Sequence, residues 1–191
     1  MVGEFQRLSD VALCAIKQDP SLLDELPWLW WVLDMALEEP ERSIAAYGSE
    51  AEAQAAIACL PPEFADLPVS FSLEKDWHVM HYLLTNRVWG GKGPLSDAIL
   101  GGTPIGPNND FGPARYLEPE EVSAVATALE PVDRPRLLRH WPPWFLPRWR
   151  LYYVGSYGEA EAEAVAFEFS ELRDYYLTAR ANGEGMILKI A

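Results

Sequence analysis

The chain has 191 residues, of which 49% are hydrophobic and 23% are charged, a composition typical of globular proteins rather than disordered or fibrous ones. This length predicts a single domain, residues 1–191, that buries its own core without a metal or a disulfide. The two cysteines are too few for a disulfide scaffold or an all-cysteine metal site. We therefore expect neither a cofactor nor a bound metal.

The sequence shows no export or membrane-spanning signal. Its first residues lack a basic leader and a long apolar stretch. The longest apolar run, from Leu26 to Leu37, is interrupted by Pro27 and Asp34 and is shorter than the roughly 20 residues that cross a membrane. We expect a cytoplasmic protein.

The charge balance restricts the class of partner. Fifteen Lys and Arg residues against 29 Asp and Glu residues give a net charge of −14. This charge repels the phosphates of nucleic acids and of anionic lipids, so neither is expected as a partner. A basic protein is the partner that this charge favours, bound to a monomer or weak dimer of the chain.

Residues 131–150 form a basic exception, with five Arg, three Trp and five Pro. Two interpretations remain open. The segment is either a surface connection, whose arginines pair with the acidic N-terminal third while its aromatic residues fill the core, or a docking patch, because Trp and Arg often dominate interface energies. Single-stranded nucleic acid is disfavoured by the surrounding negative charge.

The N-terminal third predicts one strand and three helices. The strand covers residues 1–6, and a helix capped by a serine covers residues 9–17. A helix over residues 21–39 is apolar nearly all round, so we expect it to be deeply buried. A capping-box pattern opens a further helix over residues 49–61.

The middle of the chain predicts a helix from Ser72 to Arg87, followed by a loop over residues 89–113 that is rich in Gly and Pro and contains one short apolar piece at 95–100. Residues 114–117 are predicted as a short strand that leads into a helix from Pro119 to just before Pro131. In the predicted 72–87 helix, steps of three and four residues place these side chains on one face: Trp77, Met80, His81 and Leu84.

The C-terminal part predicts a long helix over residues 159–182, because apolar residues recur at steps of four and three and Asn182-Gly183 can form its C-cap. Residues 186–190 alternate as a closing strand does. The elements together predict an α+β fold, a predominantly helical single domain around a small mixed β-sheet.

His78 and His81 stand three residues apart on one predicted helix and could face a single metal ion. Zinc needs a third protein ligand, and the helical zinc-protease pattern needs histidines four apart, so neither condition is met. We expect His81 to be buried and hydrogen-bonded, with His78 at the edge of the same face. Glu74, Lys75 and Asp76 could place a base or ion pair near His78, or form the solvated first turn of the helix.

The glycine-rich stretches contain no complete catalytic motif. Residues 90–96 lack the Gly-Lys-Ser/Thr order of a phosphate-binding loop, and the serines and cysteines lack the neighbours of a nucleophile. Arg115 stands in the middle of a predicted strand, so it must pair with an acid in the core or project into a cleft toward an anionic ligand.

The segments 73–85, 94–106, 112–117 and 172–183 together resemble the YfbM-like family of bacterial proteins, a domain of unknown function. The resemblance implies a compact cytoplasmic α+β domain and no established activity. The chain departs from the family pattern at the tryptophan-rich second helix and at residues 131–150. The motif positions, which could bind a ligand or support the fold, are Trp77, His78, His81, Tyr82, Gly101, Gly102 and Arg115.

Two functions follow from these patterns. The first is a non-enzymatic binding protein that neutralises a basic partner, as acidic immunity proteins do. The second is a small-ligand-binding protein or hydrolase-like enzyme with a cleft near His78, His81 and Arg115, in which His78 is the acid or base and Arg115 anchors an anion. The lack of a complete catalytic set favours the first.

Overall fold

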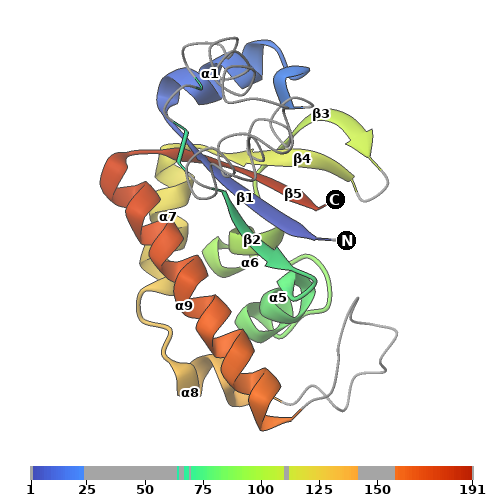
Figure 1. Ribbon diagram of the computed structural model, residues 1–191, viewed down its shortest axis with the longest axis vertical. Helices are drawn as coiled ribbons and strands as arrows, with labels where there is room; N and C mark the ends of the chain where they lie inside the picture. The colour runs from blue at the N-terminus through green and yellow to red at the C-terminus, as the bar shows by residue number, and fades with distance from the viewer. Residues whose placement is uncertain are drawn as a thin grey trace, which may run out of the picture.

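A computed structural model describes residues 2–23, 64, 67–68, 70–109, 112–141 and 158–190 (Figure 1). Its strands form one sheet in the order β2-β1-β5-β4-β3. Every pairing between neighbouring strands of this sheet is antiparallel. The strands are β1 (Gly3–Leu8), β2 (Phe71–Glu74), β3 (Thr103–Asn109), β4 (Gly112–Leu117) and β5 (Gly185–Ile190).

The α+β class is confirmed, but the sheet is antiparallel rather than mixed. The reason lies in the helices between β4 and β5. A single crossover helix would return the chain to make a parallel pair. Instead, α7 (Pro119–Leu129) leads away from the end of β4 and α9 (Glu159–Asn182) leads back, so β5 starts where β4 ended, with Leu117 opposite Met186 (Figure 1).

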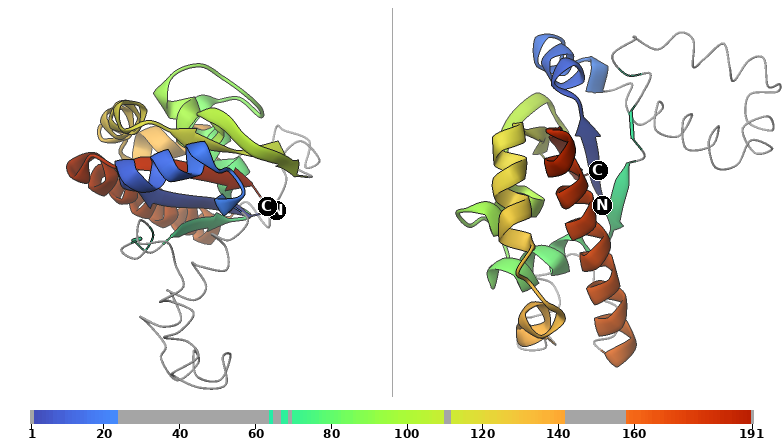
Figure 2. Two further views of the ribbon diagram at one scale, coloured as in Figure 1. Left: turned by 90° about the horizontal axis from the view of Figure 1, so that it is seen from above. Right: turned by 90° about the vertical axis from the view of Figure 1, so that its left-hand side faces the viewer.

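The two faces of the sheet carry different helices. The remaining helical elements are α1 (Asp10–Gln18), α5 (Trp77–Thr85), α6 (Pro94–Leu100), α8 (Arg134–Leu137) and the 3₁₀ turn η2 (Leu138–His140). Residues such as Phe5 and Leu188 face a core shared with α5, α6, α7 and α9, whereas Leu8 and Ile187 face a second core with α1 (Figure 2). Side chains on opposite faces of β1, β4 and β5 contribute to both cores.

Several elements agree with the sequence patterns. Ser9 caps α1 by accepting a hydrogen bond from the backbone N–H of Ala12 at 3.2 Å. The long C-terminal helix has the predicted bounds, and Gly183 ends it in the left-handed conformation at φ 68°. Helix α7 begins at Pro119 as expected, and β5 contains the predicted 186–190 strand.

Two predictions for the middle of the chain are wrong. Ser72 does not cap a helix, because it lies in β2, which pairs with β1, and the helix begins only at Trp77. The stretch 103–109, predicted as loop, forms edge strand β3. An edge strand tolerates Pro and Gly, and the pairing register of β3 shifts between Ile105 and Asn109. The apolar piece 95–100 belongs to α6. The helices predicted over 21–39 and 49–61 lie largely outside the described residues.

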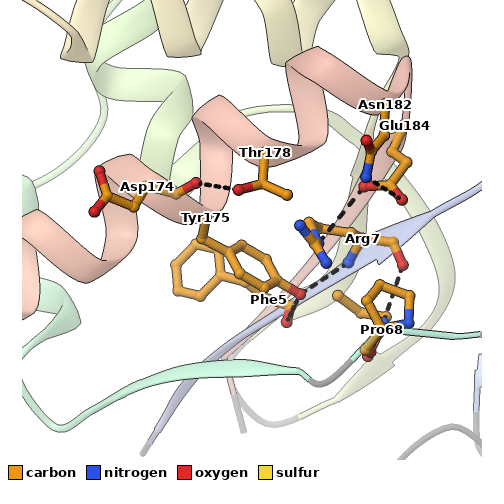
Figure 3. A network of polar contacts seen from close by, with 9 residues as sticks. Phe5, Arg7, Pro68, Asp174, Tyr175, Thr178, Asn182 and Glu184 are labelled. Carbon is orange, nitrogen blue, oxygen red and sulfur yellow. Dashed lines mark hydrogen bonds and ion pairs between the residues drawn. The ribbon is translucent and has the colours of Figure 1, made fainter.

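A polar network joins α9 to the edge of β1 (Figure 3). The pairing of β1 with β2 ends at Phe5. Beyond it, the Tyr175 hydroxyl donates to the Phe5 carbonyl at 3.2 Å and accepts from the Arg7 N–H at 3.1 Å. The Arg7 guanidinium lies over the Tyr175 ring at 4.8 Å and pairs with Glu184 at 3.5 Å. Tyr175 thus supplies the hydrogen bonds that a longer β2 would have made.

Candidate functional site

Helix α5, which carries the predicted site residues, is buried along nearly its whole length. All residues from Trp77 to Leu84 are buried, so the helix presents more than the single apolar face predicted for it. A Cβ on Gly3 would lie 2.6 Å from Cβ of Trp77. The start of α5 therefore packs directly on β1, and only glycine leaves room for that contact.

His78 lies inside the protein rather than at the edge of a face. Its side chain is 1% exposed, and its Nε2 lies 2.6 Å from the Val88 carbonyl oxygen. Because a carbonyl only accepts, Nε2 carries the proton and donates. The imidazole stacks on Trp77 at 4.7 Å and contacts the Trp89 ring at 4.3 Å. Burial lowers its pKa, against the opposing effect of the Val88 hydrogen bond.

His81 is buried and hydrogen-bonded, as expected. It is fully buried, and its Nε2 donates to the Gly90 carbonyl at 2.9 Å. Burial lowers its pKa to about 4, so the imidazole is neutral near pH 7. The same Gly90 carbonyl accepts from Ser96 Oγ at 3.2 Å. His78 and His81 together hold the connection between α5 and α6 in place.

Gly101 and Gly102 allow the backbone at the end of α6 to approach the sheet closely. A Cβ on Gly101 would lie 2.2 Å from Cα of Asp97. Gly102 has φ 88°, and its Cβ would lie 2.5 Å from the Tyr116 carbonyl oxygen. Both positions exclude a side chain on steric grounds, so the motif supports the turn into β3.

Within the described part of the chain, Arg115 bonds a backbone carbonyl and makes no ion pair with an acid. It lies on β4, is half-buried, and its Nη1 donates to the Gly102 carbonyl at 3.5 Å. The two histidines bond carbonyls of the α5–α6 connection, whereas Arg115 bonds the α6–β3 turn. Each of the three predicted site residues therefore has its own backbone partner.

Tyr82 and the potential metal ligands complete the predicted set. Tyr82 is 2% exposed, its ring lies 6.4 Å from that of His140, and burial raises the pKa of its hydroxyl. Across the part of the chain that the structure describes, no three His, Cys, Asp or Glu side chains are placed to hold a metal ion.

A group of carboxylates at the start of α5 is not evident from the sequence. Burial, together with the charges of Asp76 and Glu74, raises the pKa of Glu168, in the middle of α9, to about 7. One oxygen of Glu168 is buried without a hydrogen-bond partner among the described residues. Burial also raises the pKa of Asp76. We call Glu74, Asp76 and Glu168 the acidic group.

The described part of the basic segment, residues 131–141, both fills the core and presents arginines. Val132 and Leu137 are buried in the core. Arg134 pairs with Glu163 of α9, so the prediction that the arginines pair with the N-terminal third is wrong at this position. Arg136 is exposed beside it. The remainder of the segment lies outside the described residues.

Within the described ranges, every helix is too short or too polar to span a membrane.

Comparison with known proteins identifies the fold and the family. No curated protein sequence matches the chain. Among solved structures, the fold is similar to that of YfbM, a protein of unknown function from Escherichia coli, with a TM-score of 0.58, 17% sequence identity and 100% of both chains covered. The model of the family described as a domain of unknown function, DUF1877, matches residues 1–189. The resemblance to YfbM-like proteins is confirmed, and the chain belongs to the DUF1877 family.

Proposed function

We propose that this protein is a non-enzymatic binding protein whose acidic surface docks a basic protein partner. The observation that supports it most directly is the acidic group Glu74, Asp76 and Glu168. Two elements far apart in sequence bring these carboxylates close enough to raise the pKa of Glu168 to about 7. A protein gains no stability by placing like charges together, so a role in binding explains their position better than a role in folding.

A cation from the partner would relieve the repulsion within this group. Lys or Arg near Glu168 favours its charged form and lowers its pKa. The net charge of −14 would in addition speed the encounter with a cationic surface. Neutralisation of a basic toxin by an acidic immunity protein is the form that such docking would take.

The described site residues give the hydrolase-like alternative no support. His78 and His81 are buried at 1% and 0% exposure, and both donate to loop carbonyls. A general acid or base must reach the proton of a substrate within hydrogen-bond distance. Arg115 bonds the Gly102 carbonyl instead of pointing at either imidazole.

The test compares capture of proteins from the native host by matched variants. The triple variant Glu74→Gln, Asp76→Asn, Glu168→Gln removes the acidic group. A control removes the same charge at exposed helix starts, with Asp10→Asn, Glu120→Gln and Glu159→Gln. We expect a basic protein to bind the wild type and the control but not the triple variant. Equal retention by all three, or capture of acidic proteins only, would refute the proposal.

Calorimetry with the captured partner supplies a second measurement. Glu168 is about half protonated at pH 7 because its pKa is about 7. Docking of a cation must therefore release protons, which appears as a dependence of the binding enthalpy on the ionisation enthalpy of the buffer. The Glu168→Gln variant should lose most of that dependence while it keeps its fold.

A further inference from the structure

Helix α9 carries a stripe of residues that are exposed within the described part of the chain, apolar at its start and acidic at its end. Phe167 is 66% exposed, and the exposed residues Ala160 and Ala164 precede it at steps of four and three. This spacing places the three side chains on one face of the helix. The exposed acids Glu171 and Asp174 continue the same face, again at steps of four and three. We call these five residues the α9 stripe.

A second feature lies around α8. A cavity of about 20 Å³ opens there, which is room for one methylene group or one water. Arg136 and Arg139 stand among its lining, and the other side chains that line it are Leu83, Leu84, Leu95, Val132 and Leu137. We call Arg136, Arg139 and these apolar residues the α8 patch.

The charges of the α8 patch are incompletely matched within the chain. Four described cations outside the patch pair with acids of another element, namely Arg7, Lys17, Arg134 and Arg180. The Arg136 side chain makes no ion pair within the described ranges, although the chain has 29 acids. Arg139 donates its Nε–H to His140, which is no acid.

The two features belong to neighbouring helices, because the ion pair of Arg134 with Glu163 joins α8 to α9. We propose that two copies of this chain dock through them, the α9 stripe of each copy facing the α8 patch of the other. Two adjacent complementary patches permit a two-fold arrangement that closes as a dimer and does not extend into a filament.

The geometry of α9 specifies which residues meet. When two copies of α9 pack antiparallel about Phe167, residue 171 of one helix faces residue 163 of the other. Glu163 already holds α8 through Arg134. Glu171 of the second copy therefore lies beside α8, and the proposal pairs its carboxylate with Arg136, the exposed cation of that helix that makes no ion pair within the described ranges. The two Phe167 rings meet at the centre, where interface residues contribute most.

Sedimentation velocity measures the association directly. We expect wild-type protein between about 5 and 200 µM to show a monomer–dimer equilibrium, since one helix face and one small patch give a weak interface. Phe167→Ser should weaken the dimer about tenfold or more. Val11→Ser is the matched control, because Val11 on α1 is also 66% exposed, and it should leave the dimer unchanged.

A charge exchange tests the predicted pairing. Arg136→Glu with Arg139→Glu, and separately Glu171→Arg with Asp174→Arg, should each yield monomers, because like charges then face each other. Mixing the two double variants should restore a dimer that contains one copy of each, since both halves of the interface regain opposite charges. Salt is a poorer test, because it also screens the repulsion between two chains of charge −14.

The outcomes separate the proposal from its alternatives. A wild-type monomer at every concentration would overturn it. So would equal effects of Phe167→Ser and Val11→Ser, or a mixture of the charge variants that stays monomeric. Circular dichroism melts establish that each variant is folded, and the exposed position of Phe167 makes its replacement by serine harmless to the core.

Discussion

Replacement of Glu168 by glutamine should stabilise the protein at high pH. Burial, aided by the charges of Asp76 and Glu74, raises the pKa of this carboxyl from 4.5 to about 7 in the folded state. The unfolded chain leaves the carboxyl at its ordinary pKa. Above pH 7 the ionised carboxylate therefore lowers the free energy of unfolding, and glutamine removes that charge.

The magnitude follows from the pKa. At about 1.4 kcal/mol per pKa unit, the rise to about 7 corresponds to about 3 kcal/mol. The side chain is only partly buried, and solvent screening reduces the cost to about 1–2 kcal/mol. A raised folded-state pKa gives stability that is complete below the unfolded-state pKa and is lost as pH rises through 7. Glu168→Gln should thus gain about 1–2 kcal/mol at pH 9 and almost nothing at pH 4.

Urea denaturation followed by circular dichroism at pH 4, 5, 7 and 9 measures this difference. Glu159→Gln is the control, because Glu159 is exposed on the same helix, lies outside the α9 stripe, and its replacement changes the net charge equally. A Glu168→Gln variant with the wild-type stability at pH 9, or a gain that does not grow with pH, would refute the reasoning. An equal gain in Glu159→Gln would assign the effect to net charge alone.

Three further substitutions test the structural roles assigned above. His81→Ala should lower the free energy of unfolding by about 2–4 kcal/mol, because it leaves a cavity and removes one of the two hydrogen bonds to the Gly90 carbonyl, and an unchanged thermal melt would contradict this. Gly102→Ala should cost about 2 kcal/mol or more in the same melt, because its φ is 88° and the new Cβ would lie 2.5 Å from the Tyr116 carbonyl; a wild-type melting temperature would show that the turn can relax. Tyr175→Phe should cost about 1–2 kcal/mol and speed hydrogen exchange at the Arg7 N–H, and unchanged exchange there would show that the hydroxyl does not protect the β1 edge.

The elements that were predictable are those specified by local pattern. The α9 helix was identified with its bounds because its apolar stripe persists over many turns and Gly183 ends it. Ser9 marked the start of α1 for the same reason, since a cap bonds a backbone N–H within its own turn. Burial of His81 also followed, because its helical neighbours Trp77 and Leu84 are apolar.

The strands β2 and β3 show where local pattern fails. Serine is a common N-cap residue, so Ser72 favours the start of a helix. Pairing with β1 nevertheless makes its segment a strand. Gly and Pro in 103–109 indicate a loop, yet the segment pairs with β4 and becomes the edge strand of the sheet. Strand pairing depends on which segment lies alongside, and this information is not local.

Composition, helix periodicity and capping residues were thus enough to establish an acidic α+β protein with buried helices, because each depends on neighbours within a few turns of chain. Only the tertiary structure decided that His78, His81 and Arg115 bond separate backbone carbonyls instead of sharing a cleft. It alone brought Glu168 beside Asp76, and placed α8 next to α9. The physical reason is that electrostatic and packing energies depend on distances in space, which the folding of distant segments sets.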